Sequence, residues 1–141
     1  MGGLNLMGKI NLTTNSIDVG IVTHNEPTML DFYINTLGLT KEIEIPFPGL
    51  GTVNKLNYAD GYIKILVLNE EPKHKNHIGD FTTAPGIRYI TINLSNLSDL
   101  VDECKSKNIK IINEPIEIRP GVKVAVIQDP DGNLIELMQA S

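Results

Sequence analysis

The sequence predicts an α+β protein made of two modules, each with the order strand, helix, strand, strand, strand. Two observations predict this class. Near the C-terminus, apolar segments rich in β-branched residues, 122–128 and 134–138, flank the turn Asp129–Asn133, a pattern typical of a β-hairpin. In addition, the order of strand-like and helix-like segments in residues 17–68 recurs in residues 87–138, which indicates a duplicated supersecondary unit.

The first module is expected to begin with a strand over residues 17–23 and to continue into a helix. Asn25 is a suitable N-cap for this helix, and apolar residues then recur at helical spacing from Met29 to Leu37. Gly38 can take the left-handed conformation that ends a helix. Three strands are expected next, over residues 39–45, 53–58 and 62–68.

Loops are expected where proline and glycine interrupt these patterns. The segment 46–51 contains Pro46, Pro48 and two glycines, so it is predicted to end the strand before it. The longer polar segment 69–86 is interpreted as a linker between the modules and as a mobile flap. Residues 1–16 are interpreted as an N-terminal tail.

The second module repeats the order of the first. A strand is expected over residues 87–94, followed by a helix that Ser95 or Asn96 caps and that ends at Asn108. Cys104 falls on the apolar face of this helix and is interpreted as a small core residue rather than a nucleophile. Three strands are expected next, over residues 110–112 with an extension toward 118, 122–128 and 134–138.

The last strand carries a single charge, at Glu136. Alternation along a strand places Glu136 on one face with Leu134 and Met138, and Ile135 and Leu137 on the other. The carboxylate either lies on a solvated face or in an ion pair, or it points into a concave pocket.

Composition excludes several classes of function. The chain has 141 residues, a formal net charge of −5, 5% aromatic residues and no tryptophan, which argues against nucleic-acid binding because that requires clustered basic residues. No apolar segment approaches the roughly 20 residues of a membrane span, and no secretory signal is recognised at the N-terminus. The single cysteine excludes an intramolecular disulfide, so a cytoplasmic location is the default expectation.

Three local patterns in this order resemble the vicinal oxygen chelate (VOC) superfamily, which includes glyoxalase, extradiol dioxygenases and the bleomycin-resistance proteins. The three patterns are Val19-Gly20-Ile21 followed by Phe32-Tyr33 and Leu37-Gly38-Leu39, then Gly86–Ile92, and Asp129–Glu136. The resemblance implies a glyoxalase-like fold, in which two βαβββ modules form curved mixed sheets around a cavity. It also implies a small-molecule ligand or substrate and a homodimer.

Members of this family that use a metal take its ligands from the first and last strand of each module. The resemblance places these four positions on Asp18, Leu66, Tyr89 and Glu136. Only Glu136 matches the family pattern, in which the opening ligand is usually His and the closing one Glu. No cofactor is therefore expected, and the alternative is a weak divalent-metal site of Asp18 and Glu136. The pair His74 and His77 in the linker is interpreted as solvated.

The first functional hypothesis is a small-molecule-binding or resistance protein without the usual metal. The acidic balance of the chain would favour a cationic guest. Asp18, Tyr89 and Glu136 are the central lining candidates. Further ligand-binding candidates are Phe47, Tyr58, Tyr62, Leu66 and Phe81.

The second hypothesis is a metal-independent lyase, isomerase or epimerase. Glu136 would be the general base, and Asp18 or Tyr89 the partner acid. A metal-dependent glyoxalase-type lyase or dioxygenase is a third hypothesis. A purely structural alternative is that the carboxylates pair with Arg88 or Lys123 and hold the sheets.

Overall fold

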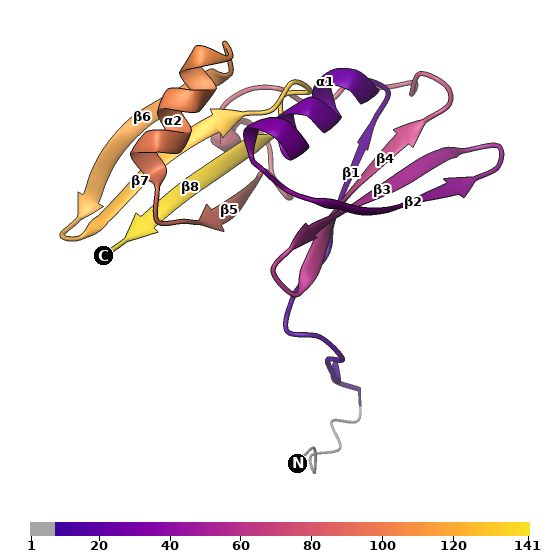
Figure 1. Cartoon of the computed structure of the whole chain (residues 1–141), viewed down its shortest axis with the longest axis horizontal. Coiled ribbons are helices and arrows are strands. Elements are labelled where there is room, and N and C mark those ends of the chain that lie inside the picture. The colour runs from indigo at the N-terminus through magenta and orange to yellow at the C-terminus, as the bar shows by residue number, and fades with distance from the viewer. Residues whose placement is uncertain (1–7) are drawn as a thin grey trace.

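Two four-stranded sheets lie side by side in the computed structural model, which describes residues 8–141 (Figure 1). The first sheet has the order β1 (Val19–Thr23), β4 (Gly61–Leu68), β3 (Gly51–Tyr58), β2 (Lys41–Phe47). The second has the order β5 (Tyr89–Asn93), β8 (Leu134–Ala140), β7 (Val122–Gln128), β6 (Lys110–Arg119). In each sheet the first strand pairs in parallel with the last, and the other pairs are antiparallel. The predicted βαβββ duplication is therefore confirmed, while residues 1–7 of the expected tail lie outside the described part.

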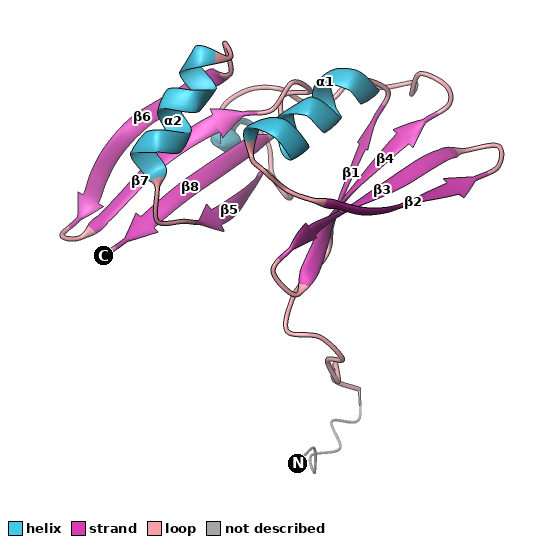
Figure 2. Cartoon of the chain, in the orientation of Figure 1, coloured by secondary structure: helices cyan, strands magenta, loops and turns pink. Residues whose placement is uncertain are grey.

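The helices α1 (Glu26–Leu30) and α2 (Leu97–Ser106) lie on the same side of the two sheets (Figures 1 and 2). The first helix was expected to be α-helical to Leu37, but its second half, η1 (Asp31–Thr36), is a π-helix. There the Leu37 N–H donates to the Phe32 carbonyl, five residues back, at 2.9 Å, which is the hydrogen bond that defines the wider π-helical turn. A 3₁₀ turn, η2 (Phe81–Thr83), interrupts the linker. None of the helices among residues 8–141 has the length and apolar character that crossing a membrane requires.

The side-chain caps predicted for the two helices are wrong. Neither Asn25 nor Asn96 accepts a capping hydrogen bond. The N–H of Leu97 donates instead to Oε1 of Gln139 at 2.8 Å, so a side chain from β8 replaces the local cap. Asn25 turns its amide toward the carboxylate of Asp131, at 3.4 Å. Tertiary partners thus displaced the local ones.

The C-terminal ends of the two helices agree with the sequence prediction. Gly38 and Asn108 have φ angles of 84° and 59°, which confirms the left-handed helix ends. Pro46 was expected to end the second strand, yet β2 continues to Phe47. Because β2 is an edge strand, the N–H that proline lacks is tolerated there.

The hydrophobic core lies between the helices and the sheets. Ile135 and Leu137 of β8 are fully buried in it, whereas Glu136 between them is half-buried and faces the other way, so the predicted alternation is confirmed. Cys104 is also fully buried, and burial raises the pKa of its thiol, as expected for a core residue. We call the side of each sheet that faces away from the helices its open face.

Candidate functional site

The turn between β7 and β8 joins the two modules through a buried carboxylate. Asp129 is only 2% exposed, and its Oδ1 accepts the backbone N–H groups of Asp131 and Asn133, both at 2.9 Å. Its Oδ2 accepts the hydroxyl of Tyr33, which belongs to η1 of the first module, at 2.6 Å. Gly132 closes the turn with a φ of 91°, a conformation that glycine adopts without steric cost.

A second contact connects the same turn to the end of β1. The hydroxyl of Thr23, 2% exposed, donates to Oδ2 of Asp131 at 2.5 Å. The Thr23 oxygen also accepts the backbone N–H of Asn25 at 2.9 Å. The C-terminal end of β1 and the β7–β8 turn therefore hold each other in place, and this fixes one end of the space between the modules.

A pocket with a volume of about 910 Å³ lies between the modules. Its walls come from β1, the start of β5, the linker and the β7–β8 turn. The linker is held over the pocket by Asn76, whose amide donates to the Asp131 carbonyl at 2.9 Å and to Oδ1 of Asn133 at 3.1 Å. The volume is within the range of small-molecule sites.

The formal charges that line this pocket balance, Lys75 and Arg88 against Glu71 and Asp131, whereas the chain as a whole carries −5. Its ionisable side chains are His24, Tyr33, Glu71, His74, Lys75, Arg88, Tyr89 and Asp131. Both carboxylate oxygens of Asp131 are already hydrogen-bonded, to Thr23 and Asn25. Glu71 is the other acidic group and is exposed.

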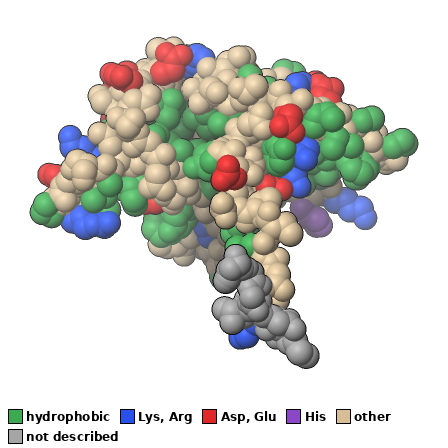
Figure 3. All heavy atoms as spheres, turned by 60° about the horizontal axis from the view of Figure 1, so that its bottom comes forward, with side chains coloured by type: hydrophobic (Ala, Val, Ile, Leu, Met, Phe, Trp, Pro, Cys, Tyr) green, Lys and Arg blue, Asp and Glu red, His purple; other side chains and the backbone are tan. Residues whose placement is uncertain are grey.

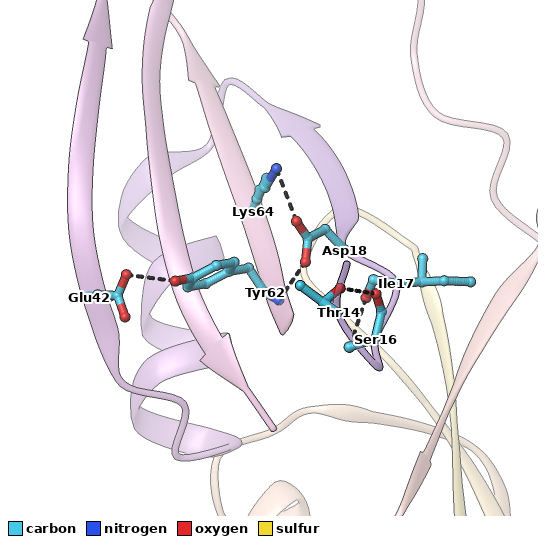
Figure 4. A network of polar contacts seen from close by, with 7 residues as sticks. All are labelled: Thr14, Ser16, Ile17, Asp18, Glu42, Tyr62 and Lys64. Carbon is cyan, nitrogen blue, oxygen red and sulfur yellow. Dashed lines mark hydrogen bonds and ion pairs between the residues drawn. The ribbon is translucent and has the colours of Figure 1, made fainter. Parts of the chain in front are cut away.

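Asp18 belongs to a separate polar network on the open face of the first sheet (Figure 4). Its Oδ1 accepts the Tyr62 N–H at 2.9 Å, and its Oδ2 lies 3.2 Å from the Lys64 ammonium. These two groups hold the pKa of Asp18 below its ordinary value of 3.8. The Tyr62 hydroxyl donates to Glu42 at 2.7 Å, which raises the pKa of Tyr62, and the Lys55 ammonium lies 4.1 Å from the ring centroid.

Glu136 and Tyr89 lie in the second module. Oε1 of Glu136 accepts the Thr91 hydroxyl from the neighbouring strand at 2.7 Å, and the Tyr89 ring packs edge-on against Phe81, with centroids 5.6 Å apart. Among residues 8–141 no hydrogen bond or ion pair joins Asp18, Tyr89 and Glu136 to one another. Tyr89 lines the pocket, whereas Asp18 and Glu136 are not among its walls. The catalytic roles of all three stay predictions.

The remaining ligand-binding candidates are dispersed. Phe47 is exposed at the end of β2, and Tyr58 packs against the core. Leu66 is half-buried, between Val22 and Val53 of the adjacent strands. None of the three lines the pocket, and their roles also stay predictions.

The strand register shows which residues occupy equivalent places in the two modules. Tyr89 pairs with Leu134, so Glu136 lies two residues beyond the partner of Tyr89. In the first module β1 and β4 run parallel, and Gly20 pairs with Lys64. Asp18 precedes Gly20 by two residues, so Lys64 lies two residues further along β4 than the residue beside Asp18. Lys64, rather than Leu66, is therefore the counterpart of Glu136.

Because Lys64 occupies this position, the residues present are a poor fit to the divalent metal that other members of the family bind. An ammonium group occupies one of the four ligand positions and already neutralises the carboxylate at another. A divalent cation placed there would be repelled by Lys64 and would have to displace its ion pair. Nowhere between residues 8 and 141 do three His, Cys, Asp or Glu side chains gather in a way that could hold a metal.

The sequence alone did not indicate the contacts or positions of three side chains, Lys64, Thr91 and Arg88. Lys64 could have been placed on the open face from its alternation with Ile63 and Ile65, but its pairing with Asp18 depends on the strand register. Thr91, the partner of Glu136, depends on register in the same way. Arg88 was considered as a partner for the carboxylates, but it reaches only the His77 carbonyl, at 3.4 Å, and its place in the pocket follows from the linker path.

The fold and the pocket define a class of protein in which two βαβββ modules lie side by side and enclose a cavity between them. Residues 16–137 match the family model of the Glyoxalase/Bleomycin resistance protein/Dioxygenase superfamily, and the chain belongs to this superfamily.

Individual proteins similar to this chain agree with that assignment. A probable lactoylglutathione lyase from Synechocystis sp. is 24% identical over 103 residues, which are 66% of this chain and 79% of that protein. A glyoxalase family protein from Bacillus cereus matches with a TM-score of 0.81 and 16% identity, over 95% of this chain and 98% of that one. The trypanothione-dependent glyoxalase I of Leishmania major matches with a TM-score of 0.68 and 21% identity, over 86% and 84% of the two chains. Because the two solved structures are only 16% and 21% identical to this chain, their similarity shows a shared fold and nothing more.

Proposed function

We propose that this protein binds a small organic molecule, without a bound metal, in the pocket between its two modules. The observation that carries the proposal is the pocket itself, whose volume is about 910 Å³ and whose walls come from both modules and the linker. The apolar part of the lining includes Ile21, Ile78 and Ile90, and a mostly apolar cavity with a few polar groups is typical of small-molecule sites.

A neutral fluorescent probe, phenylnaphthylamine, tests this proposal. Gly20 lines the pocket, and a Cβ atom at this position would meet no atom within 4 Å, so Gly20→Trp should fill the space without disturbing β1. We expect the probe to fluoresce with the wild-type protein and to lose at least about 10-fold in affinity for Gly20→Trp, since about 1.4 kcal/mol of lost contact has that effect.

The matched control for this experiment is Lys123→Trp. Lys123 is an exposed residue of β7 in the second module and does not line the pocket. This variant should bind the probe as the wild type does. Equal binding by Gly20→Trp and the wild type would contradict the proposed site.

The metal-free state leads to a second expected result. Because Lys64 occupies a ligand position and pairs with Asp18, neither EDTA nor millimolar Mg²⁺, Mn²⁺, Ni²⁺ or Zn²⁺ should change the thermal unfolding midpoint. Metal that bound the folded state would raise it, since binding to the native state stabilises by mass action. A specific rise with one of these ions that Glu136→Gln abolishes would show that a metal does bind.

A homodimer also belongs to this proposal. Val22, Ile43, Phe47 and Tyr89 are 46 to 56% exposed, and Figure 3 shows apolar side chains exposed among polar ones on the face that it presents. A second copy that covered such side chains is the partner that the family resemblance implies. The mass in solution, measured by light scattering, tests this assembly.

A further inference from the structure

We propose that the molecule bound in the inter-module pocket is an organic anion, whose carboxylate, phosphate or sulfonate group is held by the guanidinium of Arg88. This inference rests on the proposed pocket and adds the chemical class of its ligand.

The hydrogen bonding of Arg88 carries the inference. Its Nε is buried and has no acceptor among residues 8–141. The adjacent Nη2 makes one long contact, 3.4 Å to the His77 carbonyl. A buried N–H without a partner is costly and needs an explanation. An acceptor group supplied by a ligand would satisfy it.

The geometry of guanidinium selects the class of acceptor. Nε and Nη2 present two roughly parallel N–H groups, and this edge matches two oxygens of one carboxylate or phosphate. No carboxylate among residues 8–141 forms an ion pair with Arg88, since the four ion pairs of this part of the chain all involve lysines. No protein carboxylate therefore competes for this edge, and its one protein contact is the long hydrogen bond to the His77 carbonyl.

The charges around Arg88 favour the same class of ligand. Lys75 lines the pocket together with His24 and His74, so basic groups come from the residue after β1, from the linker and from the residue before β5. Of the two acidic groups, Asp131 keeps its charge but directs its oxygens to Thr23 and Asn25, and Glu71 is exposed, so that solvent screens its charge. The net charge of the chain, −5, points to a cationic guest, but the field inside a pocket depends on the nearest groups, because solvent screens distant charges.

A pair of probes that differ in one anionic group tests this inference. Anilinonaphthalene sulfonate has the ring system of phenylnaphthylamine and adds a sulfonate. We expect the wild-type protein to bind the sulfonate about 10- to 100-fold more tightly, the range that hydrogen bonds to a charged group typically supply. Arg88→Met should remove this preference, so that the variant binds the two probes with similar affinity. Arg88→Lys should keep only part of this preference, because lysine has the positive charge but lacks the two parallel N–H donors of the guanidinium.

The controls separate this inference from the proposed pocket. Arg119→Met removes the other arginine of the chain, in the β6–β7 hairpin, and should keep the full preference. If the wild-type protein binds both probes equally and Gly20→Trp lowers the affinity for both, the proposed binding site is supported and the anion inference is overturned. A preference that persists in a folded Arg88→Met protein also overturns it. If Gly20→Trp weakens neither probe, the proposed pocket itself fails.

Discussion

Replacing Asp129 by alanine is expected to lower the free energy of unfolding by about 3 kcal/mol or more, because several hydrogen bonds to one buried carboxylate are lost together. The substitution leaves the buried Tyr33 hydroxyl and the N–H groups of Asp131 and Asn133 without their acceptor. It also removes a direct contact between the modules, so both should become less stable. Urea denaturation followed by circular dichroism measures the change.

Two further variants make this prediction specific. Asp102→Ala, on the exposed side of α2, should change the stability by no more than about 0.5 kcal/mol, as is usual for exposed positions. Tyr33→Phe removes only the hydrogen bond between Tyr33 and Asp129 and should cost about 1.5 to 3 kcal/mol, as is typical of a hydrogen bond to a charged group. A loss for Asp129→Ala as small as that for Asp102→Ala would show that the turn does not hold the modules together.

The same hydrogen bond has an alkaline pH dependence. Burial, and then the charge of Asp129, raise the pKa of Tyr33 far above its ordinary value of 10.0. The unfolded chain releases this proton near pH 10.0 while the folded protein keeps it, so the stabilisation is complete at lower pH and is lost as the pH rises further. In that range the wild-type protein should lose about 1.4 kcal/mol more per pH unit than Tyr33→Phe.

Leu137→Ala is expected to destabilise the protein by about 2 to 5 kcal/mol, the range observed when a large buried side chain is truncated. Leu137 is fully buried and pairs across the sheet with Ala125, a small residue that cannot fill the cavity. The matched control is Met138→Ala, at the next position on the open face, where the side chain is half-buried. It should cost clearly less, and equal losses would mean that the faces of β8 are assigned wrongly.

The strands, the C-terminal ends of the helices and the hairpin turn were predictable because each depends on near neighbours in the chain. Alternation identified the buried face of β8, and Gly38, Asn108 and Gly132 supplied the positive φ angles that end a helix or close a turn. The recurrence of the same segments gave the two modules. These signals concern backbone conformation and burial, which residues two to four positions apart report directly.

The predictions that failed concerned partners distant in sequence. The capping role of Asn25 was lost to a contact with Asp131, 106 residues away, and Gln139 took the capping role at α2. Pro46 was expected to end the strand, but β2 lies at a sheet edge, where proline is tolerated. At the two helix starts the local capping preference is worth about 1 kcal/mol, and tertiary contacts of similar size can override it.

The sequence by itself determined the class of fold, the family resemblance and the face of the sheet on which Asp18 and Glu136 lie. Only the tertiary structure decided what those carboxylates touch: Asp18 meets Lys64, and Glu136 meets Thr91. It also placed Arg88 in a pocket between the modules. The physical reason is that alternation gives the face of a side chain, whereas its contacts depend on strand register and on the path of the linker, and both follow from the packing of the whole chain.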